Sequence, residues 1–385
     1  LDHSSSSTPD EFAKMAEFAE NLELIMAGDG PRVPNQGELL NLQNLGRSYY
    51  AKVAIAEGES VTRDKIVLHS PRTGLGQEDI GPLLGKAAVR QVGKDKVIDR
   101  SVFERPQPVD EATLAWARTA KLSLPVRFHD MDDLARRLPT GHFEFHLTFG
   151  DVAGDIDAAK FDRTNHYSVH LPDYVSSTLL MDPFSPRADQ REASDFVLNR
   201  TVEFAKALQD RTGRDCLIVG SFSNVHGSLE MFFNQHAELL STHAKSGVTI
   251  LPQWLPPIAW YFGGAARLKA MNNLADIDLI KRHQMPICMD VCHLCMGDKV
   301  FDFVAADVVK DLAPLIRHVH IADALGHDGE GLPFGEGDPG NMDAIAAAMT
   351  LDGIKVIEVW QGHLNGGDGF ARALIDLKER FDGRQ

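Results

Sequence analysis

The sequence predicts an α/β fold in which a (β/α)8 TIM barrel is preceded by a small β-rich domain. From about residue 125 onward, short apolar runs alternate with helical stretches, which is typical of βαβ units around a parallel sheet. Eight such runs can be laid out, and that number favours a closed barrel over an open sheet. Between about residues 47 and 102 the chain instead has short β-like runs separated by turns, as expected for a loop-rich β domain.

The first expected element is an amphipathic helix over residues 8–26. Thr8 and Pro9 form a helix-start signal, and apolar residues recur at helical spacing at Phe12, Met15 and Phe18. A linker rich in Gly and Pro follows over residues 28–35. The β-like runs come next, and the whole pattern predicts domain boundaries near residues 45 and 103. The expected β-like runs are residues 49–55, 66–69 and 97–102, and the expected domains are residues 1–45, 46–103 and 104–385.

The barrel strands are expected at the apolar runs of the third region. The seventh of them is weak. Helices are expected between the strands, over residues 193–212, 229–244 and 265–283. The eight expected strands, in order, are Phe143–Thr148, Tyr167–Leu171, Cys216–Ser221, Val248–Leu251, Ile287–Val291, His318–Ile321, Leu332–Phe334 and Val356–Trp360.

Composition limits the classes of protein to consider. The chain has 385 residues, 43% hydrophobic and 24% charged, so it can bury a sizeable core. No run approaches the roughly 18 apolar residues of a membrane helix, and the four cysteines are not spaced like a disulfide framework, so we expect a cytoplasmic protein without a membrane partner. The net charge of −16 argues against a nucleic-acid partner. The chain begins with Leu1, which indicates a piece of a longer protein.

Polar residues stand where the barrel strands are expected to end, and functional groups of such barrels gather there. His170 ends the second expected strand, Asp290 the fifth, His320 the sixth and Glu358 the eighth. Imidazole and carboxylate ligands together suit Zn, Mn, Co or Mg. A carboxylate on an apolar strand is costly to bury unless it is paired or binds a metal. We therefore predict a divalent-metal site at this end of the barrel.

An ordered series of short motifs runs along residues 2–102: Asp2–Phe12, Asn44–Ser48, Ala54–Glu59, Asp64–Ile66, Pro71–Leu75 and Leu84–Lys86. In this series the region resembles the C-terminal part of sialic acid (N-acetylneuraminate) synthases, including their SAF domain, an antifreeze-like β-clip domain. The resemblance implies that residues 1–45 are the end of a synthase barrel plus a linker. It also implies that His3 belongs to a metal site where phosphoenolpyruvate condenses with N-acetylmannosamine.

The SAF domain of that family covers the active site of the partner subunit and lends it an arginine, so the resemblance implies a homodimer. The arginine usually stands directly before the proline of a conserved turn. Here Ser70 occupies that place before Pro71, and Arg72 is the nearest arginine. Arg72 is therefore the candidate for substrate binding, and the alternative is an exposed turn arginine.

Residues 140–380 are similar to the xylose isomerase/endonuclease IV superfamily. Its members have His near the second strand, Glu at the fourth, Asp-x-x-His at the fifth, His-x-x-Asp at the sixth and Glu at the eighth. The resemblance implies that Asp290, His320 and Glu358 bind the metal. His170 and His293 are further ligand candidates. The chain departs from the pattern at the fourth strand, where Gln253 replaces the metal-bridging Glu, and a neutral carboxamide would weaken or alter the site.

Further candidates follow the strands. The loop over residues 326–338 is rich in Gly and acidic residues. The resemblance implies that Glu330 or Asp328 is a further ligand or contacts substrate, and the alternative is a merely solvated loop. Tryptophans near the strand ends are either core residues or platforms on which a sugar ring stacks. The candidate catalytic residues are Glu330, His363 and Gln253, and the candidate sugar platforms are Trp254 and Trp360.

The leading hypothesis is an enzyme of nonulosonic (sialic-type) acid biosynthesis whose barrel isomerises or epimerises a small-molecule sugar. The metal would polarise a carbonyl while a carboxylate or His moves a proton. The alternative is a non-catalytic sugar-binding or scaffolding barrel attached to the synthase, which is consistent with Gln253. An endonuclease IV-like nuclease is disfavoured by the negative charge, and because the third expected strand, 216–221, lacks the His that a multi-metal cluster would need.

Overall fold

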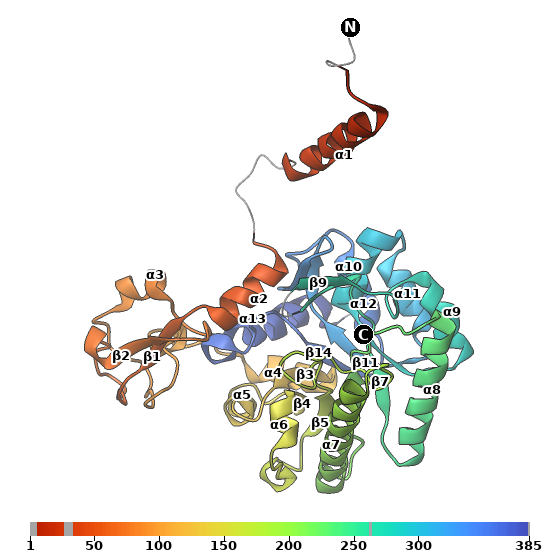
Figure 1. Ribbon diagram of the computed structural model, residues 1–385. Helices are drawn as coiled ribbons and strands as arrows, with labels where there is room; N and C mark the ends of the chain where they lie inside the picture. The colour runs from red at the N-terminus through yellow and green to blue at the C-terminus, as the bar shows by residue number, and fades with distance from the viewer. Residues whose placement is uncertain (1–5, 27–33, 262–263, 384–385) are drawn as a thin grey trace. The chain divides into compact units, whose positions relative to one another are not determined.

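The computed structural model describes residues 6–26, 34–261 and 264–383 (Figure 1). His3, the ligand implied by the synthase resemblance, lies outside the described residues. The chain divides into two compact units, residues 1–35 and residues 36–385. The first unit contains α1 (Pro9–Met26), which confirms the expected helix. Thr8 and Glu11 cap its start, because each backbone N–H donates to the side chain of the other residue, at 2.7 and 3.2 Å.

The second unit contains eight parallel strands in one sheet, so the predicted α/β barrel is confirmed. Sequence neighbours pair in order around the sheet, and β14 pairs with β3. A single parallel bridge between Gln253 and Cys288 links β7 to β10 and completes the circle. The strands are β3 (Leu122–Val126), β4 (His142–His146), β5 (His166–His170), β6 (Ile218–Gly220), β7 (Ile250–Pro252), β10 (Ile287–Asp290), β11 (Ile316–Ile321) and β14 (Ile354–Ile357).

Helices surround the strands (Figure 1). The expected helices over residues 193–212 and 229–244 are confirmed as the long helices α7 and α8. No helix in the described part of the chain is both long and apolar enough to cross a membrane. The helices of the barrel are α4 (Glu111–Thr119), α5 (Met131–Arg137), α6 (Phe149–Ala153), α7 (Ala188–Thr212), α8 (Leu229–Lys245), α9 (Leu274–Arg282), α10 (Val291–Phe301), α11 (Ala305–Leu312), α12 (Asn341–Met349) and α13 (Leu364–Phe381), with the 3-10 turn η5 (Ala158–Lys160).

The structure differs from the expected barrel at three places. The first strand is β3, which was missed because Pro125 interrupts its apolar run. The expected seventh strand near residues 332–334 instead follows a hairpin of β12 (Asp323–Leu325) and β13 (Gly329–Leu332) beside the barrel sheet. The start of the expected helix over residues 265–283 is also a hairpin, of β8 (Ile258–Tyr261) and β9 (Gly264–Arg267). Because β3 precedes them, the first to sixth expected strands each move up by one place.

Residues 47–103 form a small β-containing region with its own hydrophobic core, separate from the core of the barrel. Its strands β1 (Ser48–Ala51) and β2 (Ile66–His69) pair antiparallel. Isolated bridges join Tyr50 to Val97 and Ile55 to Val92, so the region has little regular sheet. Its remaining elements and the helix before it are α2 (Gln36–Leu45), η2 (Arg63–Lys65), α3 (Gln77–Ile80), η3 (Gly81–Leu83) and η4 (Arg100–Val102).

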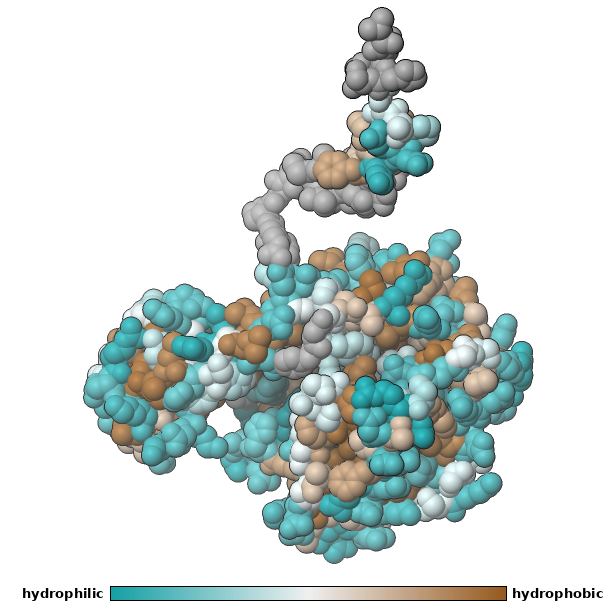
Figure 2. Space-filling view, viewed as in Figure 1, coloured by the Kyte–Doolittle hydropathy of each residue, from teal (hydrophilic) through white to brown (hydrophobic). Residues whose placement is uncertain are grey.

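The core of the barrel contains polar side chains as well as apolar ones. Phe143, Phe145 and Leu124 are fully buried, and the intervening Glu144 is also fully buried. On the outside, hydrophilic residues cover most of the face in Figure 2, with apolar residues in scattered patches. The alternation along β4 places Glu144 on the opposite side of the strand from the two phenylalanines, which is the inside of the barrel.

His236 gives the fold a pH dependence. It is buried on α8, where Nδ1 donates to the Phe232 carbonyl at 2.8 Å and the ring packs on Phe232 at 4.0 Å. Burial lowers the pKa of His236 to about 4. Because the unfolded chain binds the proton more tightly, this residue costs stability as the pH falls from about 6.5 to 4, by about 3 kcal/mol in all.

We predict that, as the pH falls over that range, the free energy of unfolding decreases less for His236→Leu than for the native chain. The measurement is the free energy of urea unfolding at pH 7, 6, 5 and 4 for both chains. Equal pH slopes would contradict the assignment of a buried, neutral His236.

Candidate metal centre

Three of the predicted ligands meet at the carboxyl ends of the barrel strands. Asp290 ends β10, His320 lies near the end of β11, and Glu358 directly follows β14. One ligand atom from each lies within 4.8 Å of the other two. His320 Nδ1 is 3.0 Å from Glu358 Oε2 and 3.8 Å from Asp290 Oδ2. Two carboxylates and one imidazole at this spacing fit a divalent ion such as Zn, Mn, Co or Mg.

The charges in this cluster perturb one another strongly. Burial raises the pKa of Asp290, and the neighbouring Glu358 adds to that rise. Burial alone would also raise the pKa of Glu358, but His320 outweighs it and holds that pKa well below its usual range. Burial by itself lowers the pKa of His320, whereas Cys288, Glu358 and Glu144 raise it well above the ordinary value. The cluster is therefore a concentration of charge that a bound cation would stabilise.

Gln253 lies in the middle of the site, just after β7. Its Nε2 donates to Asp290 Oδ2 at 2.8 Å and lies 3.2 Å from His320 Nδ1. Its Oε1 accepts from Ser221 Oγ at 2.8 Å and lies 3.0 Å from His170 Nε2. The carboxamide thus turns its NH2 group, which cannot bind a metal, toward the predicted ligands. Its oxygen points to His170, so His170 contacts Gln253 instead of the three-ligand cluster.

Glu144 was missed in the sequence, although it is the most completely paired carboxylate of the site. Its Oε2 accepts from Ser168 Oγ and His318 Nε2, both at 2.7 Å. Its Oε1 lies 2.9 Å from His320 Nε2, an ion-pair distance without hydrogen-bond geometry. Burial alone would raise the pKa of Glu144, but His320 and His318 hold it well below its usual range. A charged residue between Phe143 and Phe145 was the available signal.

His146 was also missed, because the strand that it ends was counted as the first of the barrel. Its Nε2 lies 3.0 Å from Glu144 Oε1 and 3.4 Å from Glu358 Oε1. Its ring is 4.9 Å from that of His170, centroid to centroid. The actual second and third strands therefore end in His146 and His170. The third strand thus ends in a histidine, contrary to the expectation, because the expected strand order was shifted by one place.

His293 and Glu330 form a pair beside Asp290. Asp290 caps α10 by accepting from the backbone N–H of His293, which brings the imidazole Nδ1 within 3.1 Å of Asp290 Oδ2. His293 Nε2 lies 3.2 Å from Glu330 Oε1, on β13 of the hairpin. Burial lowers the pKa of His293, but Asp290 and Glu330 outweigh it and raise that pKa to about 9.

The remaining candidates lie around this centre. Trp254 is fully buried in the barrel core, so it is a core residue and not an exposed platform for a sugar ring. His363 precedes α13, and burial, followed by the charge of Arg127, lowers its pKa to about 4. Arg72 forms ion pairs with Glu78 and, at 3.5 Å, with Asp79. Arg72 and Trp360 line the same cavity of about 390 Å³, apart from the metal-ligand cluster.

Asp328, expected as a substrate-contacting residue, forms hydrogen bonds with other residues of the chain. Its carboxylate accepts from the indole N–H of Trp260 and, at 3.1 Å, from the backbone N–H of Gln36. It therefore joins the start of α2 to the β8–β9 hairpin. Glu330, two residues further on, is the member of this loop that reaches the metal-ligand cluster, through His293.

Comparison with known proteins identifies the family. Residues 134–379 match the family described as the xylose isomerase-like TIM barrel, and the chain belongs to this family. A search of curated proteins found no match.

Solved structures give similar folds at low identity. A D-tagatose 3-epimerase-like protein is 15% identical, with a TM-score of 0.48, over 69% of this chain and 98% of that one. Endonuclease IV from Thermus thermophilus is 14% identical, with a TM-score of 0.47, over 67% and 99%. A xylose isomerase domain-containing protein from Salmonella typhimurium is 12% identical, with a TM-score of 0.45, over 71% and 98%.

We predict that Glu144→Gln destabilises the fold by about 3 kcal/mol at pH 7, because it removes the charge that pairs with two buried imidazoles. Ser168→Ala is the matched control, since it removes one hydrogen bond to the same carboxylate and is expected to cost about 1 kcal/mol. Urea unfolding measures both. A smaller loss for Glu144→Gln than for Ser168→Ala would show that the buried charge has no such role.

Proposed function

We propose that the barrel is a divalent-metal-dependent sugar isomerase or epimerase. The observation that carries the proposal is the meeting of Asp290, His320 and Glu358 at the mouth of a xylose isomerase-like barrel. The pair of His293 and Glu330 adjoins this cluster and provides groups that can exchange protons. Isomerisation and epimerisation move a hydrogen on the carbon next to a sugar carbonyl. They require a group that polarises the carbonyl and an adjacent group that transfers the proton, as a metal-ligand set beside such a pair provides.

A divalent ion held by Asp290, His320 and Glu358 would polarise the sugar carbonyl and the adjacent hydroxyl. The chain supplies the proton transfer. Glu330 is partly exposed, so its carboxylate can take the proton from the carbon next to the carbonyl and return it to the carbonyl carbon, while the proton of the adjacent hydroxyl passes to the carbonyl oxygen. His293 has a pKa of about 9 and is protonated at pH 7, so it donates to Glu330 and holds that carboxylate in place.

Gln253 has a positioning role in this proposal. By donating to Asp290 Oδ2 it orients that carboxylate, and by accepting from Ser221 it fixes its own orientation. His146 Nε2 lies 3.4 Å from Glu358 Oε1, and the His146 ring lies 4.9 Å from that of His170, centroid to centroid, so both imidazoles would contact substrate hydroxyls. His363 and Trp360 are proposed as residues that surround the sugar, and Trp254 as one that supports the site from the core.

We further propose that the chain is part of a sialic acid synthase-type protein of carbohydrate biosynthesis. The support is the series of motifs over residues 2–102 and the small region over residues 47–103 with its own core. Residues 1–45, 46–103 and 104–385 are the proposed domains, with the second an SAF domain. On this proposal the protein is a cytoplasmic homodimer, and Arg72 contributes to sugar binding.

The alternative function is a sugar-binding or scaffolding barrel without catalysis. Gln253 favours this alternative, because it stands where a fourth, negatively charged ligand is expected. Its neutral NH2 group faces Asp290 and cannot bind a metal. The nuclease hypothesis is favoured by His146 and His170, because these histidines at the strand ends would serve a multi-metal cluster. The net charge of −16 still opposes binding to a phosphate backbone.

Metal analysis tests the proposed centre. The native chain, dialysed against excess Mn²⁺ or Zn²⁺ and then buffer, is expected to retain one ion, and Asp290→Asn is expected to bind at least tenfold more weakly because it loses a charged ligand. Asp307→Asn, an exposed residue on α11 that pairs with Lys310, is the matched control and should bind as the native chain does. Retention of no ion by the native chain, or equal affinity for Asp290→Asn, would refute the centre.

Proton exchange separates the enzyme from the scaffold. The native chain with metal is expected to incorporate solvent deuterium into ketohexoses or aldohexoses, measured by mass spectrometry. Glu330→Gln should keep the metal and lose at least a hundredfold in exchange rate, because it lacks the general base. Sugar binding without exchange by the native chain would favour the scaffold, and unchanged exchange by Glu330→Gln would contradict the role of Glu330.

A further inference from the structure

Helix α2 lies across the carboxyl ends of the barrel strands that bear the predicted metal ligands. It packs on β8 of the hairpin that follows β7 (Figure 1). Its first residue bonds to the turn of the hairpin that follows β11, and its second half faces residues that follow β14. In the closed sheet β10 lies between β7 and β11. Helix α2 therefore spans the part of the barrel mouth where Asp290, His320 and Glu358 meet.

The start of α2 is fastened to the barrel by Asp328, in the turn of the β12–β13 hairpin. The Asp328 carboxylate accepts from the indole N–H of Trp260 and, at 3.1 Å, from the backbone N–H of Gln36. Gly37 lies against the same indole, and a Cβ added at Gly37 would clash with the ring carbons of Trp260. One carboxylate and one aromatic ring therefore hold α2 and both hairpins together.

The remainder of α2 is held loosely to the barrel. Of its ten residues, all of which the structure describes, Gln36 alone is buried. Leu42 is exposed, and a cavity of about 390 Å³ is lined by Leu39 and Leu42 on the helix and by Trp360 on the barrel. An element with few buried contacts opens at a low cost in free energy. The contacts of Asp328 are therefore the main restraint on movement of α2 away from the barrel mouth.

The β12–β13 hairpin carries both Asp328 and the proposed general base. Glu330 lies on β13, where its Oε1 is 3.2 Å from His293 Nε2. The next residue, Gly331, donates its backbone N–H to Cys292 Sγ at 3.3 Å, and Cys292 is buried beneath the hairpin. Cys292 and His293 belong to the first turn of α10, directly after β10. The hairpin therefore covers the α10 side of the candidate centre and sets the distance between Glu330 and His293.

We propose that α2 and the β12–β13 hairpin form a lid over the candidate centre, and that Asp328 is the latch that holds this lid closed. While Asp328 bonds to Trp260 and Gln36, Glu330 stays beside His293 and the α10 side of the centre is covered. When these bonds break, α2 leaves the Trp260 ring and the hairpin is free to move, which opens the centre to solutes. The lid depends on contacts within the chain, so the proposal does not require a bound metal or a particular sugar.

Thiol labelling of the full chain tests the lid, because Cys292 lies beneath the hairpin. The chain is treated with N-ethylmaleimide in the presence of EDTA, and peptide mass spectrometry measures the labelling rate of each cysteine. Asp328→Ala and Gly37→Ala are expected to label Cys292 at least about tenfold faster than the native chain, because each favours local opening. Asp328→Ala removes both accepted hydrogen bonds. Gly37→Ala places a Cβ against the Trp260 ring, although alanine by itself favours the helix.

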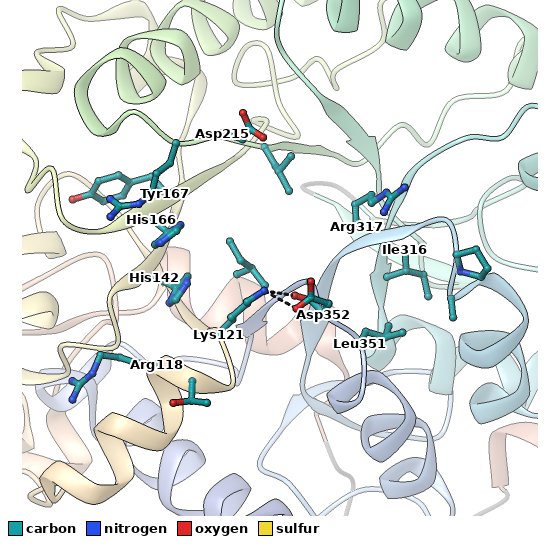
Figure 3. A pocket seen from close by; sticks show the side chains of 17 residues that line it. Arg118, Lys121, His142, His166, Tyr167, Asp215, Ile316, Arg317, Leu351 and Asp352 are labelled. Atoms are coloured by element: carbon teal, nitrogen blue, oxygen red, sulfur yellow. Dashed lines mark hydrogen bonds and ion pairs between the residues drawn. The ribbon is translucent and has the colours of Figure 1, made fainter. Parts of the chain in front are cut away.

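Two controls separate opening of the lid from a general loosening of the fold. Gly150→Ala is the matched variant, because Gly150 lies in α6, where an added Cβ has room, and it should label Cys292 as the native chain does. Cys216 is the internal control, because it is buried far from the hairpin. It lies between Asp215 and Leu217, which line a cavity of about 750 Å³ at the amino ends of the strands (Figure 3). Its labelling should not change in any variant.

The proposal is overturned if neither Asp328→Ala nor Gly37→Ala labels Cys292 faster than the native chain. It is also overturned if Cys216 labelling rises as much as Cys292 labelling, or if Gly150→Ala has the same effect as Gly37→Ala. Because the labelling is measured without metal or sugar, a failure of the proposed isomerase or epimerase activity would leave these rates unchanged. The two proposals can therefore fail separately.

Discussion

The interaction on which this barrel depends is the pairing of the Glu144 carboxylate with imidazoles in the interior. Glu144 is fully buried, and a buried charge is strongly unfavourable unless close partners compensate it. Its partners come from three strands: His146 on the same strand, Ser168 on β5, and His318 and His320 on β11. Because Glu144 lies against Nε2 of His320, Nδ1 of that ring faces the mouth of the barrel. The orientation of the His320 ligand atom is therefore determined by the buried charge of Glu144, which lies in the layer of side chains below the metal ligands.

The closure of the barrel and the candidate centre occupy the same place. Seven of the eight strand junctions contain ordinary ladders, whereas β7 and β10 are joined by one bridge, at Gln253 and Cys288. The side chain of Gln253 continues that junction, since it donates to Asp290 at the end of β10. A carboxylate at this position would meet the negative charge of Asp290 across the junction. The carboxamide compensates that charge with a hydrogen bond, so closure does not depend on a bound ion.

The sequence predicted the barrel and the meeting of Asp290, His320 and Glu358, because apolar alternation and residue type are local properties. It did not reveal β3, whose run contains Pro125, or the hairpin over residues 323–332, because strand pairing depends on distant partners. Glu144 was missed for the same reason: its role depends on imidazoles that lie far away in the sequence. The importance of Gln253 was expected from its position, but the direction of its amide is determined by neighbours on three other strands.

Both ends of the barrel strands carry polar side chains, but in different arrangements. At the carboxyl ends, carboxylates and imidazoles converge, whereas at the amino ends the imidazoles of His142 and His166 stack on each other. Anomalous diffraction from Mn²⁺-soaked crystals tests the candidate metal centre at the carboxyl ends most directly. An anomalous peak is expected within bonding distance of Asp290, His320 and Glu358. A fully soaked crystal without a peak there, or with its main peak elsewhere, would contradict it.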